Sequence, residues 1–235
     1  MTLSRIQKYF VKINLVCFTI LQTTICETIN ANVESRIEGE GFHRSLKYQI
    51  NFDNQILGCY VSIYLELPSG LYVNVNELSN LRSLRVNTAC LIGETNIDMF
   101  SEKAEIQKVT VCSFLNDIQC IMKLPVHQRY QYASKNNRYV NITLPKPKLL
   151  LGCRKRIKEY RISKIDLCSP CTKLIPKWRE IPYIMHTEHV WIIPAGDTMI
   201  LPTVTYTTLL LTILCTIYLM QTILKSMSKQ HQKKE

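Results

Sequence analysis

The stretch GCYVSIYLELPSG (residues 58–70) decides the fold class of this 235-residue chain. Its first ten residues are rich in β-branched and aromatic side chains, and it ends at Pro68-Ser69-Gly70, a combination typical of a turn. The stretch therefore predicts a buried β-strand that stops at a turn. LYVNV (71–75) then resumes the strand pattern.

Similar patterns occur on both sides of this stretch. Upstream, apolar residues alternate with polar ones between Leu46 and Phe52, which predicts a strand with one buried face. Downstream, further strand-like segments lie at 105–115, 121–132, 138–144 and 183–193. Several short strands separated by turns favour a mostly β fold, and we expect a β-sandwich-like domain.

Three segments depart from this pattern. Leucines recur at every third position between 78 and 84, which predicts a helix within 75–86. Residues 27–41 are polar, and we expect them to be irregular. Residues 154–182 are expected to form an irregular, cysteine-bearing insertion, to which the sequence assigns no role.

The N-terminus has the pattern of a secretory signal peptide. A polar, basic segment is followed by INLVCFTILQTTI (13–25), which is uncharged but too short for a membrane span of about 20 residues. We expect cleavage near Cys26, so that residues 1–26 are a signal peptide. An uncleaved anchor is the alternative, and the polar residues 22–24 disfavour it.

The C-terminal part of the chain predicts one transmembrane helix. Residues 198–224 contain no charged side chain and are long enough to cross a hydrocarbon layer of about 30 Å. Lysines follow in the tail 225–235, which the positive-inside rule places in the cytosol. The sequence thus predicts a single-pass type I membrane protein whose main domain, residues 27–197, lies in the lumen.

The charge of the chain agrees with a membrane topology. Its 29 Lys and Arg residues outnumber its 18 Asp and Glu residues, giving a formal net charge of +11. More than half of this excess lies in residues 1–26 and 225–235, at the two ends of the chain. We therefore interpret the basicity as a topology signal and expect no nucleic-acid partner.

Four threonines in the predicted span are separated by three or four residues and would share one helix face. Small hydroxylated side chains allow a partner helix to approach closely and to form hydrogen bonds. Alternatively, each hydroxyl bonds the carbonyl four residues earlier in its own helix. The sequence leaves both readings open. The candidate partner-helix face is Thr205, Thr208, Thr212 and Thr216.

Seven of the ten cysteines fall in the predicted lumenal domain, where thiols are oxidised. These candidate disulfide cysteines are Cys59, Cys90, Cys112, Cys120, Cys153, Cys168 and Cys171. Because seven is odd, at least one of these cysteines is free unless Cys26 remains after processing or a partner protein supplies another cysteine. The sequence does not determine which cysteines pair. Asn141-Ile142-Thr143 is a glycosylation sequon, and we expect Asn141 to carry a glycan.

The motif Cys168-Ser169-Pro170-Cys171, followed by His186 and His189, resembles a zinc or redox site. The histidine spacing is short for zinc, and a redox pair would need a βαβ context, so structural disulfides are favoured. The motifs of hydrolases, phosphate-binding loops and dinucleotide-binding folds are absent from the sequence. We therefore expect a non-catalytic protein with no cofactor and no metal.

Several short motifs occur in a fixed order along the chain. They are Gly41-Phe42-His43-Arg44, Leu67-Pro68-Ser69-Gly70-Leu71-Tyr72-Val73, Asn76-Glu77-Leu78, Leu124-Pro125-Val126-His127 with Arg129-Tyr130, Leu150-Leu151-Gly152-Cys153, and Ile193-Pro194-Ala195-Gly196. Together with the signal peptide and the single span, this order resembles the phosphatidylinositol-glycan biosynthesis class X (PIG-X) family over most of residues 41–224.

The resemblance implies a non-catalytic, stabilising subunit of glycosylphosphatidylinositol (GPI) mannosyltransferase I in the endoplasmic-reticulum membrane. That enzyme transfers the first mannose to the GPI-anchor precursor, and the resemblance implies the multi-span subunit PIG-M as the partner that performs the chemistry. Two other functions remain open. One is a single-pass cell-surface adhesion or receptor module with an immunoglobulin-like sandwich, and the other is a lumenal thiol oxidoreductase that uses the CSPC motif.

Overall fold

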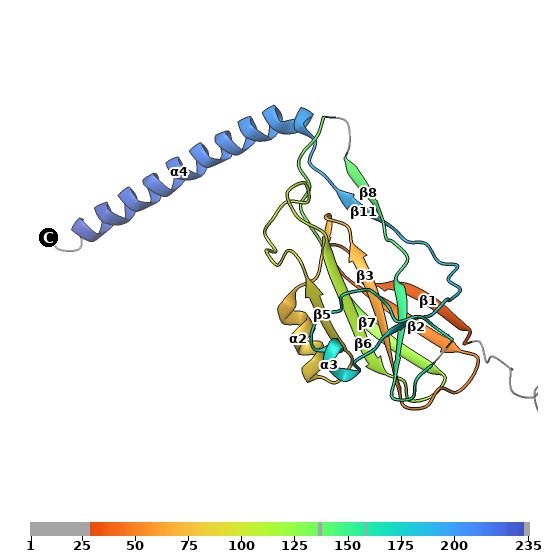
Figure 1. Cartoon of the computed structure of the whole chain (residues 1–235). Coiled ribbons are helices and arrows are strands. Elements are labelled where there is room, and N and C mark those ends of the chain that lie inside the picture. The colour runs from red at the N-terminus through yellow and green to blue at the C-terminus, as the bar shows by residue number, and fades with distance from the viewer. Residues whose placement is uncertain (1–28, 136–137, 158, 233–235) are drawn as a thin grey trace, which may run out of the picture.

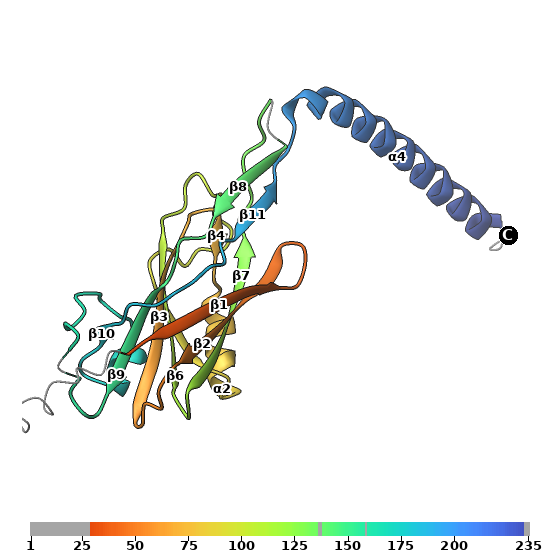
Figure 2. The same cartoon turned by 90° about the vertical axis from the view of Figure 1, so that its right-hand side faces the viewer.

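Two antiparallel sheets pack face to face in the computed structural model, which describes residues 29–135, 138–157 and 159–232 (Figures 1 and 2). The four-stranded sheet has the order β1 (Ala31–Glu38), β2 (His43–Phe52), β7 (Gln119–Gln128) and β4 (Leu71–Tyr72). The five-stranded sheet has the order β10 (Arg179–Glu180), β9 (Lys148–Cys153), β3 (Cys59–Leu67), β6 (Gln107–Phe114) and β5 (Thr88–Ile92). The predicted β-sandwich-like fold is confirmed.

The remaining elements surround these two sheets. A two-stranded ribbon of β8 (Tyr139–Thr143) and β11 (Val190–Pro194) lies at one end of the sandwich (Figure 2). The helical elements are α2 (Val75–Ser83), α3 (Cys171–Leu174), the short 3-10 turn η1 (Thr198–Ile200) and α4 (Leu201–Gln232). The helix expected within 75–86 is therefore confirmed as α2.

The alternation seen in the sequence builds the core between the sheets. The inward-facing residues of β2, from Leu46 to Phe52, are at most 3% exposed, as are Val61, Ile63 and Leu65 of β3. Trp191 of β11 is fully buried in the same cluster. Because side chains of both sheets share one continuous core, hydrophobic burial holds the two layers together.

Residues 27–41 were expected to be irregular, and for residues 31–38 this expectation is wrong. Residues 31–38 form strand β1, which pairs with β2 along its whole length, from Ala31 opposite Phe52 to Glu38 opposite Ser45. Its inward face includes the buried Ser35, whose hydroxyl lies 2.9 Å from the Thr187 hydroxyl and 2.7 Å from His189 Nε2. The sequence of this strand has a polar pattern because one of its core positions is occupied by a serine, whose buried hydroxyl is hydrogen-bonded.

The segment 154–182 is largely irregular and covers the outer face of the five-stranded sheet. A second apolar cluster forms there from Tyr64, Cys112, Leu150, Leu167, Cys171, Ile175 and Trp178. Gly152 makes this contact possible, since a Cβ at that position would lie 3.0 Å from a ring carbon of Trp178. The insertion is therefore a third layer on the sandwich.

Three disulfides join six of the seven candidate cysteines. Cys59–Cys153 links the neighbouring strands β3 and β9, whereas Cys90–Cys168 and Cys112–Cys171 attach the outer layer to β5 and β6. Cys120 is a free thiol, 5% exposed, and burial raises its pKa to about 11, so it stays protonated at neutral pH.

The chain leaves the sandwich through α4, which extends away from it as an isolated helix (Figure 1). Residues Thr198–Ser226 are long and apolar enough to cross a membrane. An 18-residue window within them reaches a mean hydropathy of 1.8, and none of it is buried inside the described protein. The predicted single membrane-spanning helix matches this segment, although α4 continues to Gln232. The predicted signal peptide, residues 1–26, lies outside the described residues.

We predict that replacing Cys59 and Cys153 together by alanine lowers the free energy of unfolding by about 2–5 kcal/mol, because the unfolded chain regains conformational freedom. The bond closes a loop with a sequence separation of 94. Denaturant unfolding of the purified full chain in detergent measures the effect. Cys120→Ala is the matched control and should cost less, and equal stability of the two variants would contradict the prediction.

Candidate functional site

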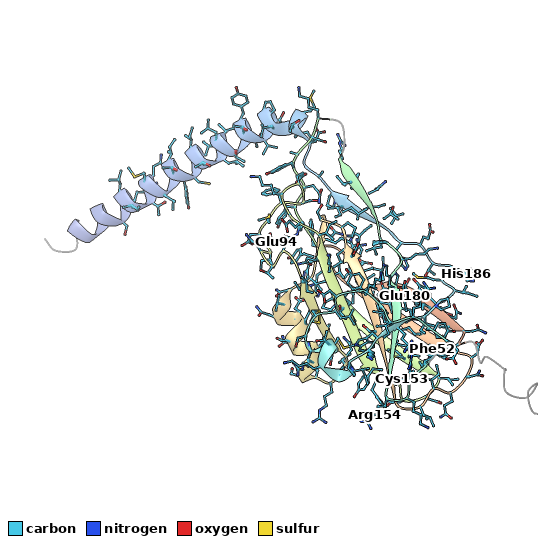
Figure 3. The ribbon with its side chains drawn as sticks, viewed as in Figure 1. Phe52, Glu94, Cys153, Arg154, Glu180 and His186 are labelled. Atoms are coloured by element: carbon cyan, nitrogen blue, oxygen red, sulfur yellow. A yellow bond between two sulfur atoms is a disulfide. The ribbon has the colours of Figure 1, made fainter. Side chains whose placement is uncertain are left out.

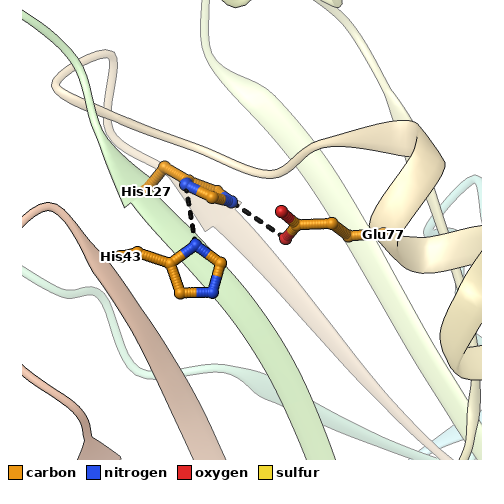
Figure 4. A group of neighbouring side chains, drawn as sticks. All are labelled: His43, Glu77 and His127. Atoms are coloured by element: carbon orange, nitrogen blue, oxygen red, sulfur yellow. Dashed lines mark hydrogen bonds and ion pairs between the residues drawn. The ribbon is translucent and has the colours of Figure 1, made fainter.

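Motifs that lie far apart in the sequence meet on the outer face of the four-stranded sheet. His43 opens β2 and lies directly opposite His127 near the end of β7. On the other side of β7, Tyr72 of β4 lies opposite the same His127. Glu77 reaches this point from the first turn of α2 (Figure 4). The strand register therefore assembles the cluster.

The three polar side chains form a hydrogen-bonded chain. His127 Nε2 lies 2.9 Å from a carboxylate oxygen of Glu77, and His127 Nδ1 lies 3.2 Å from His43 Nδ1 (Figure 4). A carboxylate only accepts, so His127 donates to Glu77 through Nε2. Of the two Nδ1 atoms, one donates to the other, which fixes the relative orientation of the two rings.

An arginine and a tyrosine complete the cluster. The Tyr72 ring stacks on His127 with centroids 4.9 Å apart, and the Arg129 guanidinium lies 4.8 Å from the Tyr72 centroid. Arg129 is only 1% exposed, and burial lowers its pKa, with nearby Glu94 opposing that shift. Its Nη1 donates to the carbonyls of Asn96 and Met99, at 2.7 and 3.2 Å. Arg129 therefore fastens the loop 94–101 to the end of β7.

The cluster has the ligand types of a divalent metal site. His43, Glu77 and His127 offer ligand atoms within 4.8 Å of one another. From the sequence we expect no metal, and this group leaves no signal there, because no local spacing connects residues on three separate elements. In the described structure His127 lies within hydrogen-bond distance of both other side chains, through Nε2 to Glu77 and through Nδ1 to His43.

The segment that follows the site is hydrogen-bonded to the chain at the start of α4. The backbone N–H of Ser134 donates to the Gly196 carbonyl at 2.9 Å, and that of Thr198 donates to the Ser134 carbonyl at 3.1 Å. Arg138 Nε lies 3.3 Å from a carboxylate oxygen of Asp197, whose other oxygen caps the turn η1 at the N–H of Met199. The segment that follows β7 thus holds the chain where α4 begins.

The two cysteines of the CSPC motif are bonded to two different strands, β5 and β6. Cys168 is bonded to Cys90 and Cys171 to Cys112, so the two cysteines form neither a redox pair with each other nor a pair of zinc thiolates. His189, which was weighed as a zinc ligand, instead lies within hydrogen-bond distance of Ser35 on β1. The structure thus gives no support to the oxidoreductase function.

The remaining candidate residues lie on exposed surfaces. Asn141 is exposed on β8, opposite Ile192 of β11. All four threonines of the proposed helix face are exposed on α4, and each hydroxyl donates to the carbonyl four residues earlier at 2.7–2.9 Å. Any contact through this face would therefore depend on close packing and on hydroxyl oxygens as acceptors, since the donors are already used.

Comparison with known proteins gives one consistent family. The model of the PIG-X / PBN1 family matches residues 39–224. A human protein named "GPI alpha-1,4-mannosyltransferase I, stabilizing subunit" is 29% identical over 202 residues, covering 79% of this chain and 77% of the human one. The mouse protein of the same name is also 29% identical, and the alignment covers 79% of this chain and 78% of the mouse one. The adhesion or receptor alternative gains no support from these relatives.

Among solved structures, a cohesin module of a family 33 glycoside hydrolase from Clostridium perfringens aligns with 71% of this chain and 97% of its own. The TM-score is 0.27 and the identity 7%. That similarity is too low to support an inference about fold or function.

We predict that Arg129→Ala lowers the free energy of unfolding by about 2–3 kcal/mol, because two carbonyls lose a charged donor. Hydrogen exchange should accelerate most in residues 94–101, which Arg129 holds against β7. Arg82→Ala, an exposed position on α2, is the control and should change stability by less than about 0.5 kcal/mol. Unchanged exchange in that loop would show that Arg129 does not position it.

Proposed function

Because the chain belongs to the PIG-X / PBN1 family, we propose that it is the stabilising subunit of a GPI alpha-1,4-mannosyltransferase I. The family match over residues 39–224 carries this proposal, supported by relatives with that name aligned over 79% of the chain. The catalytic partner would be a multi-span mannosyltransferase of the PIG-M type. That partner would transfer the first mannose to the GPI precursor, and this chain would contribute no reacting group.

The chemistry of the described site is compatible with an accessory role. His43, His127 and Glu77 hydrogen-bond one another, and Arg129 is buried against backbone carbonyls. Groups held in this way orient strands and loops, and they keep a surface in one conformation for recognition. The chain would thus act through binding, with no cofactor.

We place the sandwich in the lumen of the endoplasmic reticulum, with α4 crossing the membrane once and the tail in the cytosol. Three disulfides support an oxidising compartment, and the lysines that follow the apolar segment support a cytosolic C-terminus. The signal peptide expected in residues 1–26 would direct this orientation.

Stabilisation of the partner would follow from mass action. A subunit that binds the folded partner and not its unfolded state shifts the equilibrium toward the folded form and protects it from degradation. In the membrane, the face formed by Thr205, Thr208, Thr212 and Thr216 offers small side chains against which a partner helix can pack closely.

We predict that Asn141 carries a glycan of the immature, endoglycosidase-H-sensitive type, because it is exposed and the sandwich is proposed to be lumenal. Gel mobility of the full chain before and after digestion measures this. Asn141→Gln should abolish the shift, whereas Asn51→Gln, outside any sequon, should not. A glycan resistant to this enzyme would favour the cell-surface alternative, and an unmodified chain would contradict the prediction.

We predict that cells lacking this chain have less of the catalytic partner and fewer GPI-anchored proteins at the surface, and that the full chain restores both. Thr212→Leu should restore the partner several-fold less well, because a larger side chain separates the helices. Immunoblotting of the partner and flow cytometry of a GPI-anchored marker measure the two effects.

Thr207→Leu is the matched control for this experiment. Thr207 makes the same bond to the carbonyl four residues earlier but lies on another face of α4. Equal rescue by the two variants would exclude the threonine face as the contact. Mannose transfer by the purified chain alone would contradict the accessory function itself.

A further inference from the structure

Four aromatic side chains form an exposed row beside the site. Phe42 and Tyr130 have ring centroids 5.9 Å apart, Tyr130 and Phe100 6.4 Å, and Phe100 and Tyr132 4.7 Å, the last pair being stacked. Their exposed fractions are 45%, 69%, 39% and 43% for Phe42, Tyr130, Phe100 and Tyr132. We call these four residues the aromatic platform. Contiguous apolar surface of this kind usually marks a contact with another molecule or with a membrane.

The platform is held rigidly by its backbone. The N–H of Ser101 donates to the Tyr130 carbonyl at 3.0 Å, and the N–H of Tyr132 donates to the Glu102 carboxylate at 2.8 Å. Arg129 donates to the carbonyls of Asn96 and Met99, which precede Phe100 in the same loop. The backbone that carries Phe100, Tyr130 and Tyr132 is therefore fixed by hydrogen bonds, which reduces the ordering required on binding.

The platform continues directly into the start of the membrane helix. Tyr132 lies two residues before Ser134, which is hydrogen-bonded to Gly196 and Thr198, so its backbone is at most about 7 Å from that junction. The polar headgroup layer of one leaflet is itself about 5–7 Å thick. A residue this close to the first residues of the span is within reach of the headgroup layer.

The loop that carries Phe100 begins on the half of the sandwich nearer the start of α4. In the view of Figure 3, Glu94 at the beginning of this loop lies on the side toward which α4 extends. Phe52, Cys153 and Arg154 mark the opposite end of the sandwich (Figure 3). Glu94 thus lies nearer the start of α4 than these three residues do (Figure 3).

We propose that the aromatic platform lies in the headgroup layer of the lumenal leaflet and seats the sandwich on the membrane next to α4. Aromatic side chains concentrate at this depth in membrane proteins, because an apolar ring and a polar tip suit the interface. Phe100 and Tyr132 lie nearest the junction and enter the layer, whereas Phe42 lies at its outer edge. The inference rests on the proposed function only in requiring that α4 crosses the bilayer with the sandwich in the lumen.

Tryptophan fluorescence of the full chain in phosphatidylcholine nanodiscs tests the proposal. Single substitutions Tyr132→Trp, Phe100→Trp and Phe42→Trp are each compared in ordinary lipid and in lipid brominated on its acyl chains near the headgroup. Trp178 and Trp191 are at most 6% exposed and give the same background in every variant. Leu57→Trp, 72% exposed in the loop between β2 and β3 at the far end, is the solvent control. Leu211→Trp in α4 is the membrane control, and it is measured in lipid brominated deep in its acyl chains.

We expect emission from Tyr132→Trp and Phe100→Trp to shift to shorter wavelength and to be quenched by the brominated lipid. Phe42→Trp should be quenched less, and Leu57→Trp should behave as in water. If the platform variants resemble Leu57→Trp while Leu211→Trp is quenched, the platform does not contact lipid and the proposal is overturned.

Two other outcomes would also overturn the proposal. If the platform variants respond only when the multi-span partner is added, the platform is a protein-docking surface. If Leu211→Trp is not quenched by deeply brominated lipid, α4 does not cross the bilayer, and the proposed topology fails together with this inference. The membrane control thus separates a failure of the platform from a failure of the topology.

Discussion

The antiparallel pairing of β2 with β7 is the constraint on which the described site depends. These two strands pair from His43 opposite His127 to Asn51 opposite Gln119, and their alternate side chains form the inner layer of one sheet. A shift of one residue in this register would turn the buried face outward, so the core fixes the register. The same register places the two histidines side by side on the outer face, although they are 84 positions apart in the sequence.

Local pattern was sufficient to predict most of the sandwich and insufficient to predict the site. The strands around residues 46–52 and 58–67 were recognisable because apolar or β-branched side chains repeat in them. Strand β1 was not predicted because a serine, Ser35, occupies one of its core positions. The Ser35 hydroxyl has its hydrogen-bond partners in Thr187 and His189, which lie more than 150 positions away. The aromatic, imidazole and guanidinium contacts arise from strand register and loop closure, which no local window contains.

The cysteines illustrate the same limit. Their number and the predicted compartment indicated disulfides, yet spacing alone could not distinguish a bonded CSPC pair from two cysteines bonded elsewhere. In the structure, the second arrangement binds an irregular segment to the outer face of the five-stranded sheet. A segment with little regular hydrogen bonding of its own is ordered by two covalent links and an apolar cluster. Its order therefore depends on oxidation as well as on burial.

The junction between sandwich and α4 has a mechanical consequence. Only Ala195, Gly196 and Asp197 separate β11 from the turn η1, and they are bonded to Ser134 and Arg138 of the segment that follows β7. A connection this short and this well bonded transmits torque, so the angle of α4 about its own long axis is set by the orientation of the sandwich. A contact that fixes the rotation of the sandwich consequently selects the side of α4 that neighbouring helices meet.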